Sequence, residues 1–537
     1  MGIRRRDLLK VGSGGLAGAA LGVISLRPAH ARDDSGSSGA PSGRDFDVRL
    51  FGAIGDGKTI DTPSINKAID AAAAAGGGVV RFPAGQYLCY SIRLKSNVCL
   101  SLEHGAVIIA AESLPPGVSG GYDEPESNQP WEAFQDFGHN HWHNSLIWGV
   151  GLHDVSIVGP GRIWGRGLSR DNGPTTRNPI ERRTQGVGNK SIGLKNCRNV
   201  LLKGFQILEG GWFGILATGV DNLNIDGLTI DTNRDGMDID CCRNVHISNC
   251  SVNSPRDDGI VLKSSYALGQ NRACENVTIS SCLVSGAYVV GSVLDGTWKN
   301  RDKGGIGRIK FGTESNGGFK NIVITNCILD GCKGLTLESE DGGALEDIVI
   351  DNIVMRNLVE PPIFIRLNAR LSGPGVIKPG AIRRVAISNL ISSNAASRQA
   401  CIISGLPDFP VEDLKILNLY LEHKGGEPRE PAHLISPENL SVKPGDAGMS
   451  GATPSQGFFM RHVRNIEMNN VQIVATAPDQ RPSFVLRHVD GADFFRVRTN
   501  EPSDVSKFVL NDVSNFQAAR CCGIEDTEVP HTAHEEI

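Results

Sequence analysis

The feature that most constrains the fold is a short strand-like pattern that recurs along most of the chain. Each copy alternates apolar and polar residues, opens on a polar residue and usually closes on Asn, Ser or Gly. The ten copies begin at Asp154, Asn199, Asn222, Asn244, Asn276, Asn321, Asp347, Arg384, Asp413 and Asn465. Period-two alternation is typical of strands with one buried face, so the chain consists mainly of repeated short strands.

The spacing of the copies indicates how these strands are connected. Successive copies start 45, 23, 22, 32, 45, 26, 37, 29 and 52 residues apart. The short intervals fit single coils of a solenoid, and the longer ones fit double coils or coils with inserted loops. Repeats of this length without helical periodicity predict an all-β fold, a right-handed parallel β-helix. A β-sandwich is the alternative, but it would show hairpin turns rather than one recurring coil.

Two further features fit a solenoid. Residues 64–75, SINKAIDAAAAA, form the one convincing helix after the N-terminal segment, and they are placed to cap the N-terminal end of the stack. Cys250, Cys282 and Cys327 occupy the same position in their repeats, so we expect them to stack inside the coils. Thirteen cysteines is an odd number, and buried free thiols are at least as good an interpretation as disulfides.

The N-terminus carries export features. Residues 5–10, RRDLLK, resemble the twin-arginine pattern, an apolar run follows, and Ala29-His30-Ala31 offers a cleavage site. The expected parts are a signal peptide at 1–31, a disordered linker at 32–46 and a single β-helix catalytic domain at 47–537, less clearly patterned after about residue 420. We expect a periplasmic or secreted monomer with no membrane segment after signal cleavage. An uncleaved anchor is the alternative.

Charge excludes one class of partner. The net charge is -5 over 537 residues, which gives no global bias toward nucleic acid. A polyanionic ligand would therefore need Arg or Lys residues placed locally at its site.

Carboxylates cluster in two short polar segments, here called the acidic knots. They are Asn233-Arg234-Asp235-Gly236 and Arg256-Asp257-Asp258-Gly259. The 22 residues from Asp235 to Asp257 equal one coil, and neighbouring strands lie about 4.8 Å apart. Asp235 is therefore expected one rung below Asp257 and Asp258, provided that a turn or bulge exposes both members of the pair. Three carboxylates in one cleft would raise at least one pKa, which suits the acid and base of glycoside cleavage. Asx turns that close coils are the alternative.

These knots carry a resemblance. Asn233-x-Asp235-Gly236 and Asp257-Asp258 match two of the four motifs of the family 28 glycoside hydrolases, the polygalacturonase family, and residues 51–87 look like the opening of pectin-degrading β-helix enzymes. The resemblance implies hydrolysis of pectin-type plant cell-wall polysaccharide or oligosaccharide with inversion. It gives Asp257 as general acid, Asp235 and Asp258 as the residues that activate water, and Asn233 as an orienting residue. It implies no cofactor and no metal.

The other two family motifs are altered. The Gly-His-Gly motif falls on Gly305-Ile306-Gly307 or, by another count, on Gly286-Ala287-Tyr288, and neither contains His. The Arg-Ile-Lys motif, which holds the galacturonate carboxylate in the family, occurs as Arg308-Ile309-Lys310 one coil early, while Thr336 and Glu338 stand at the usual place. This change favours a neutral or branched sugar, or a uronate in a different orientation.

Several further side chains are candidates for substrate contact. The expected substrate-binding residues are Asn233, Lys263, Arg308, Lys310, His141 and Arg366. His139, Trp142, His143 and Arg370 lie beside them in the sequence. The His-x-His-x-His pattern could bind zinc, but no Cys or carboxylate stands at ligand spacing. Residues 115–144 are expected to fold over one end of the cleft, which would favour exo attack.

Two other functions fit the sequence. One is a β-helix polysaccharide lyase, with Ca²⁺ held by the acids and Lys263 or Lys310 as base. The other is a non-catalytic, glycan-binding β-helix in which the acids only close turns. A lyase product absorbs in the ultraviolet through its new double bond, and a binding protein would keep its affinity after Asp257→Asn.

Overall fold

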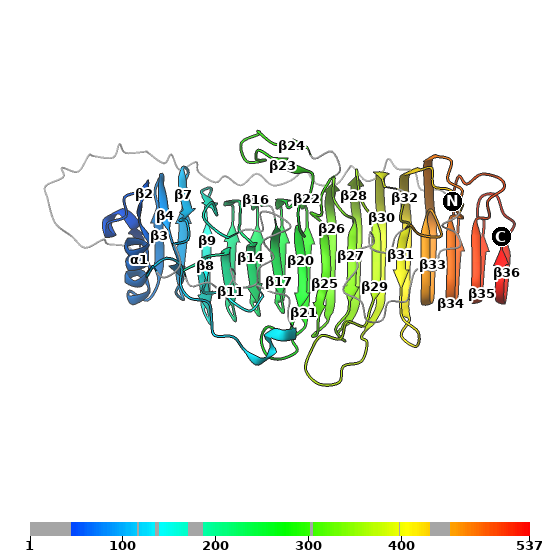
Figure 1. The fold of residues 1–537 in the computed structure, drawn as a ribbon, viewed down its shortest axis with the longest axis horizontal. Helices are drawn as coiled ribbons and strands as arrows, with labels where there is room; N and C mark the ends of the chain where they lie inside the picture. Colours follow the sequence, from blue (N-terminus) through cyan, green and yellow to red (C-terminus); the bar gives the residue numbers. More distant parts are fainter. Residues whose placement is uncertain are drawn as a thin grey trace, which may run out of the picture. The chain divides into compact units, whose positions relative to one another are not determined.

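The computed structural model describes residues 45–114, 118–134, 139–169, 186–232, 234–300, 304–396, 398–429 and 452–537. In these residues the chain winds into a parallel β-helix whose coils stack along one axis (Figure 1). Thirty-four strands join into one continuous sheet system, and the last strand alone pairs antiparallel to its neighbour. The predicted signal peptide, most of the predicted linker and Asn233 lie outside the described residues.

Each coil contributes to up to three strand stacks. The stack that carries the two acidic knots, here called the site sheet, contains β5 (Ile92–Arg93), β8 (Ser145–Val150), β11 (Lys190–Lys195), β14 (Phe213–Thr218), β17 (Asp235–Asp240), β20 (Ile260–Ser264), β25 (Ile309–Ser315), β27 (Leu335–Ser339), β29 (Ile363–Leu367), β31 (Cys401–Ser404) and the first residues of β33 (Phe458–Ala477), β34 (Phe484–Phe495) and β35 (Phe508–Ala519). At the C-terminal end of the stack, β36 (Thr527–Glu536) pairs with β35.

The second stack, here called the repeat sheet, holds all ten recurring strands on successive coils. Its strands are β1 (Asp45–Asp47), β3 (Gly78–Phe82), β6 (Val98–Leu102), β9 (His153–Val158), β12 (Arg198–Lys203), β15 (Asp221–Asp226), β18 (Arg243–Ser248), β21 (Cys274–Ser280), β26 (Phe319–Asp330), β28 (Ala344–Arg356), β30 (Ala381–Ala395), β32 (Val411–Gly425) and the central part of β33. Every interval between copies is thus one coil, and loops account for the long ones.

The third stack merges with the repeat sheet from β26 onward, where one long strand serves both stacks. It contains β2 (Asp56–Ile60), β4 (Gly85–Cys89), β7 (Ala106–Ala110), β10 (Arg162–Trp164), β13 (Gln206–Leu208), β16 (Thr229–Asp231), β19 (Ser251–Asn253), β22 (Leu283–Ser285) and the last residues of β26, β28, β30, β32 and β33. The 45-residue interval before Asn321 includes a small antiparallel hairpin, β23 (Tyr288–Val290) and β24 (Lys299–Asn300).

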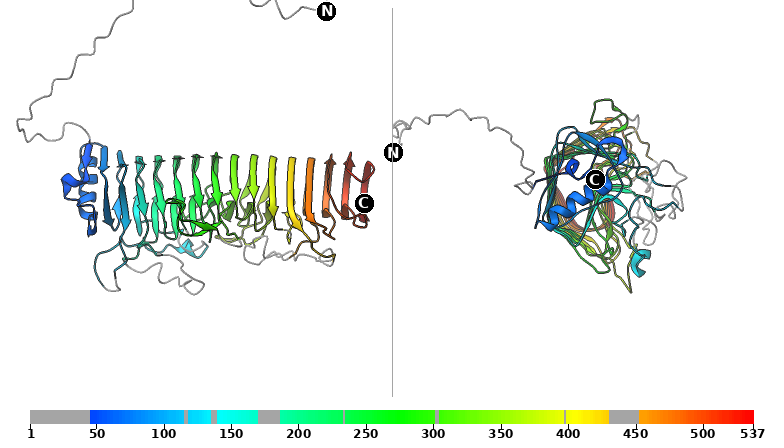
Figure 2. Two further views of the ribbon diagram at one scale, coloured as in Figure 1. Left: turned by 90° about the horizontal axis from the view of Figure 1, so that it is seen from above. Right: turned by 90° about the vertical axis from the view of Figure 1, so that its left-hand side faces the viewer.

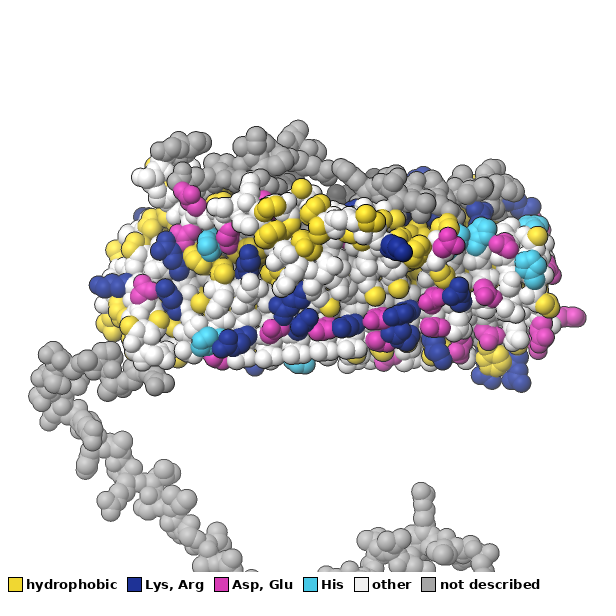
Figure 3. All heavy atoms as spheres, turned by 90° about the horizontal axis from the view of Figure 1, so that it is seen from below, with side chains coloured by type: hydrophobic (Ala, Val, Ile, Leu, Met, Phe, Trp, Pro, Cys, Tyr) yellow, Lys and Arg dark blue, Asp and Glu magenta, His cyan; other side chains and the backbone are white. Residues whose placement is uncertain are grey.

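The polar residue that opens each repeat has a conformational reason. All ten openers have a positive φ, between 54° and 60°. Asn and Asp adopt this left-handed conformation at lower cost than most residues. The Asn side chains also bond from coil to coil, for example Asn222 Nδ2 to Asn199 Oδ1 at 2.9 Å and Asn244 Nδ2 to Asn222 Oδ1 at 3.1 Å. Beside this ladder, basic and acidic side chains are interspersed in a row along one face (Figure 3).

The interior is one continuous apolar core that runs through the coils. Cys250, Cys282 and Cys327 stack inside it on successive coils, as predicted, and all thirteen cysteines, which lie in the described residues, are free thiols. Helix α1 (Thr62–Ala74) lies at the N-terminal end of the stack, where a cap was predicted (Figure 2). Two 3-10 helices, η1 (Val48–Phe51) and η2 (Pro130–Phe134), complete the described helices. None of these is long and apolar enough to cross a membrane.

Candidate active site

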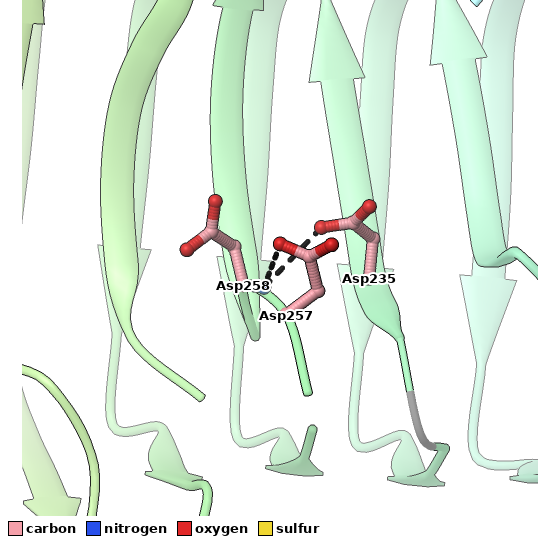
Figure 4. Close-up of side chains that lie close together, drawn as sticks. All are labelled: Asp235, Asp257 and Asp258. Carbon is pink, nitrogen blue, oxygen red and sulfur yellow. Dashed lines mark hydrogen bonds between the residues drawn. The ribbon is translucent and has the colours of Figure 1, made fainter. Parts of the chain in front are cut away.

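The two acidic knots meet on the site sheet (Figure 4). Met237 of β17 pairs with Ile260 of β20, and Gly236 N donates to Asp258 O at 3.0 Å. Asp235 therefore lies one rung from Asp258, as the spacing predicted. Oxygens of Asp235, Asp257 and Asp258 lie within 4.8 Å of one another. The side chains of Asp235 and Asp258 are 7% and 5% exposed, whereas that of Asp257 is 25% exposed.

Glycines set the direction of the acids. A Cβ on Gly236 would lie 2.4 Å from Gly259 O and 2.6 Å from Val252, and one on Gly259 would lie 2.5 Å from Val284. Val252 and Val284 belong to the core, so at this point of each coil the glycine occupies the inward position. The acid before it therefore points away from the core, even though strict alternation with the following strand residues would turn it inward. This irregularity is the turn or bulge that the sequence required.

All three carboxylates lie near cations, and Asp235 has the most distant one, with Arg234 Nη2 4.0 Å from Asp235 Oδ2. Arg234 bonds Asp257, and its guanidinium stacks over the Trp212 ring at 3.5 Å. Arg308 Nε donates to Asp258 Oδ1 at 2.7 Å. Lys310 Nζ lies 3.5 Å from Asp258 Oδ2, so two cations from the neighbouring coil stabilise negative charge on this acid.

Asp235 has the opposite environment. Burial, reinforced by the nearby charges of Asp257 and Asp238, raises the pKa of Asp235 well above its usual range, and Arg234 and Lys263 only partly oppose this. The cluster thus combines an acid whose pKa is raised with two acids that form close ion pairs with cations. This is the separation of acid and base roles that glycoside cleavage requires.

A second ionic cluster lies beside the acids on the same sheet. Lys263 Nζ bonds Glu314 Oε2 at 2.8 Å and lies 3.8 Å from Asp238 Oδ2, which also contacts His139 Nε2 at 3.0 Å. Burial would raise the pKa of Glu314, but the charges of Lys263 and Arg370 hold it well below its usual range. Burial raises the pKa of Asp238 despite its contacts with Lys263 and His139. Sequence reasoning missed Asp238 and did not assign Glu314, because their partners come from other coils and loops.

An irregularity in strand β25 brings Glu314 next to Lys263. Leu262 pairs with Phe311 but Ser264 pairs with Ser315, so β25 contains two more residues than β20 over this stretch. The extra length places Glu314 beneath the ammonium group of Lys263. The predicted substrate-binding residue Lys263 is therefore held within the protein, with 8% of its side chain exposed.

The cluster continues on the next coils. Arg370 Nε bonds Asp341 Oδ1 at 2.8 Å, and Asn368 Nδ2 donates to Glu340 Oε1 at 3.2 Å. Burial and the nearby charge of Glu338 raise the pKa of Glu340 to about 8, against the opposing charge of Arg370. Glu340 is therefore largely protonated at neutral pH in the folded protein.

This shift predicts how stability depends on pH. An acid whose pKa is raised on folding binds more protons in the folded state, so stability falls as pH rises from about 4.3 toward 8. Glu340→Gln should remove this loss, so the urea midpoint of the variant should exceed that of the wild type at pH 9 and match it near pH 4. Glu346→Gln is the control of opposite sign, because hydrogen bonds from Arg383 and Arg384 lower the pKa of Glu346. A Glu340→Gln variant that is less stable than the wild type at pH 9 would contradict the assignment.

The displaced Arg-Ile-Lys motif lies next to Asp258. Arg308 and Lys310 lie one coil from Asp258 and contact it directly, and Arg308 Nη1 also reaches Thr336 Oγ1 at 3.3 Å. Lys310 Nζ lies 3.7 Å from Glu338 Oε2, so the acid at the usual motif position pairs with this lysine. Arg366, half-buried, is aligned with Glu338 on the following coil.

The two alternative positions for the missing His lie against each other. Ile306 N donates to Pro255 O at 3.1 Å and Gly307 N donates to Asp257 O at 2.9 Å, so residues 305–307 run directly beside the paired acids. A Cβ on Gly286 would lie 2.8 Å from Gly305 C. The backbone of residues 305–307, where one count placed the altered motif, therefore lies directly beside Asp257.

The histidine-rich segment does not form a single cluster. His139 contacts Asp238, His141 Nε2 lies 3.7 Å from Glu132 Oε2, and His143 Nε2 lies 3.6 Å from Glu126 Oε1. Among the described residues, the one group with metal-ligand geometry consists of Asp235, Asp257 and Asp258. These oxygens could hold a hard cation, but the cations of Arg234, Arg308 and Lys310 already lie against them.

The described part of the segment 115–144 runs along one side of the site sheet (cyan in Figure 1). At one end Arg93 Nε bonds Asp123 Oδ2 at 2.8 Å. At the other, the Phe134 ring lies 6.4 Å from that of Tyr266, and Phe134 O accepts from Ser372 Oγ at 2.8 Å. The segment therefore borders several coils of the site, where a fold over one end was expected.

Comparison with known proteins places this geometry in context. A family model described as "Right handed beta helix region" matches residues 169–306, and one described as "Rhamnogalacturonase A/epimerase, pectate lyase-like" matches residues 46–109. The chain is 25% identical over 239 residues to a probable polygalacturonase of Vitis vinifera, covering 40% of this chain and 43% of that protein. It is 46% identical over 67 residues to mannuronan C5-epimerase AlgE5 of Azotobacter vinelandii, covering 12% of this chain and 7% of the epimerase.

Solved structures share the fold of this chain. An exopolygalacturonase from Thermotoga maritima superposes with a TM-score of 0.55 at 18% identity, covering 93% of this chain and 96% of that chain. The chain thus has the pectin-lyase-like, right-handed parallel β-helix fold, with polygalacturonases among its relatives and structural neighbours. The chain spans less than half the length of each curated relative named above.

Proposed function

We propose that this protein is a divergent family 28 glycoside hydrolase that cleaves O-glycosidic bonds in a pectin-type or related polysaccharide. The observation that carries the proposal is the acid cluster of Asp235, Asp257 and Asp258, in which the pKa of Asp235 is raised while Asp257 and Asp258 form close ion pairs with cations. Polygalacturonases among the relatives support the substrate class.

The charges suggest how the acids divide the work. Burial and the nearby charge of Asp257 raise the pKa of Asp235, so a proton shared between these two acids favours Asp235. The pair delivers this proton to the glycosidic oxygen, and Asp257, the most exposed member, faces the sugar. Asp258, which forms ion pairs with Arg308 and Lys310, accepts a proton from the water that attacks the anomeric carbon. The family resemblance alone gives Asp257 as acid and Asp235 as a partner of the water.

A substrate panel tests the proposal. The full-length protein is incubated with polygalacturonate, rhamnogalacturonan, a neutral galactan and an alginate, and new reducing ends are measured together with ultraviolet absorbance. We expect new reducing ends on a pectic substrate without added absorbance. Cleavage that produces absorbance would identify a lyase, and a change in sugar composition without cleavage would identify an epimerase. Either result would overturn the proposal.

A further inference from the structure

A cavity of about 720 Å³ opens beyond the acid site, near the C-terminal end of the same stack. Its lining combines an apolar floor with charged and polar side chains. The apolar residues are Pro482, Val485, Val505 and Val509, and the polar ones are Arg429, Gln480, Arg487, Asp504, Ser506, Asn511, His534 and Glu536. A concave site with a few convergent polar groups on apolar surface is the usual form of a ligand site.

Most of the charges in this cavity are paired. Arg429 Nη2 donates to Asp504 O at 2.7 Å and lies 4.0 Å from Asp504 Oδ2. Glu536 Oε2 accepts from Ser506 Oγ at 3.0 Å, and Glu536 Oε1 lies 3.7 Å from His534 Nε2.

Arg487 is the exception. Its guanidinium lies 5.7 Å from the Phe459 ring, and among the described residues no carboxylate lies within ion-pair distance. Its side chain is half-buried, and this burial lowers the pKa of Arg487. A partly desolvated cation without a counter-charge is costly for a folded protein and fits a site for an external anion.

One row of aligned side chains runs from the acid site to the cavity. Glu338, which contacts Lys310 beside Asp258, is aligned with Arg366, then Ser404, Arg461 and Arg487 on successive coils. From β20 the steps β25, β27, β29, β31, β33 and β34 place Arg487 about 29 Å from the acids. A glycan chain lying along the stack could thus contact both places.

We propose that this cavity is a remote glycan-binding site in which Arg487 holds the carboxylate of a uronate unit. The choice of a uronate chain as ligand rests on the proposed function, and the cavity itself does not. The planar guanidinium offers paired donors to a carboxylate, and the valine floor offers a surface for the apolar face of a sugar ring. Neutral glycans lack the anion and should bind the cavity weakly.

Arg487→Gln tests the site. Binding of trigalacturonate is measured by calorimetry in full-length proteins that all carry Asp257→Asn, so that the ligand is not cleaved, with a neutral galacto-oligosaccharide as comparison ligand. We expect the uronide Kd attributed to this site to weaken about 10- to 100-fold, the loss typical of one charge-assisted contact, while the thermal midpoint is unchanged or higher. Arg496→Gln is the matched control, because Arg496 also lies over a phenylalanine ring, Phe495, but lies outside the cavity.

The outcomes separate this inference from the proposed hydrolase. Uronide binding that is equal with and without Arg487→Gln, or lost equally in Arg496→Gln, would overturn the remote site whether or not the wild-type protein cleaves pectin. Loss of uronide binding in Arg487→Gln, together with a wild-type protein that cleaves nothing, would support the site and count against the hydrolase alone.

Discussion

Asp257→Asn and Asp235→Asn are each expected to lower kcat on a cleavable pectic oligosaccharide by about 100- to 10,000-fold, the range of general acid–base contributions. The reason is that both acids take part in the proposed delivery of a proton to the glycosidic oxygen. The value of kcat is obtained from initial rates of formation of new reducing ends. Thermal unfolding checks that each variant is folded. Asp493→Asn, an exposed site on β34 far from the acids, is the control and should retain wild-type activity.

The pH dependence distinguishes the two acids. Activity that needs a proton on Asp235 falls as pH rises through the pKa of this residue, and because that pKa is raised, activity should extend well above pH 4. The residual activity of Asp235→Asn should no longer show this fall as pH rises. Because Asp235 favours its protonated form in the fold, Asp235→Asn should also raise stability at pH 7. Near-wild-type kcat in Asp257→Asn would remove this acid from the mechanism.

Lys263→Met is expected to lower the free energy of unfolding by about 3–5 kcal/mol, the cost of breaking a buried ion pair. The substitution leaves Glu314 and Asp238 buried beside each other without the ammonium group that compensates them. Chemical unfolding followed by circular dichroism measures the loss. Adding Glu314→Gln to the same chain should restore part of it, because the stranded charge is then removed as well.

Lys320→Met is the matched control for this loss. Lys320 forms an ion pair with Glu275 at 2.9 Å, but its side chain is 45% exposed, so its removal should change stability by no more than about 1 kcal/mol. Equal losses from Lys263→Met and Lys320→Met would contradict this account, because the buried pair of Lys263 and Glu314 would then contribute no more than an exposed one.

The parts of the molecule that the sequence predicts are those determined by local spacing. The recurring strands give the coils, and the 22-residue offset places Asp235 beside Asp257 and Asp258, because in a solenoid one interval is one rung. The helix at residues 62–74 is visible from its alanine-rich composition alone.

What the sequence did not predict depends on contacts between distant coils or on irregular strands. The two extra residues of β25 change which side chain meets Lys263, and no repeat pattern encodes such a change. The partner of Asp238 is His139, 99 residues away. Gly236 and Gly259 do carry a signal, since a glycine directly after an acid in successive coils marks a point where alternation is broken.

The most direct test of the central claim is cleavage in water enriched in oxygen-18, followed by mass spectrometry of the products. Hydrolysis adds one water molecule for each bond broken, so each new reducing end made by the wild-type protein should carry a single heavy oxygen, and Asp257→Asn should make almost none. Cleaved products without the heavy oxygen would show elimination instead of hydrolysis, and would contradict the roles given to Asp235, Asp257 and Asp258.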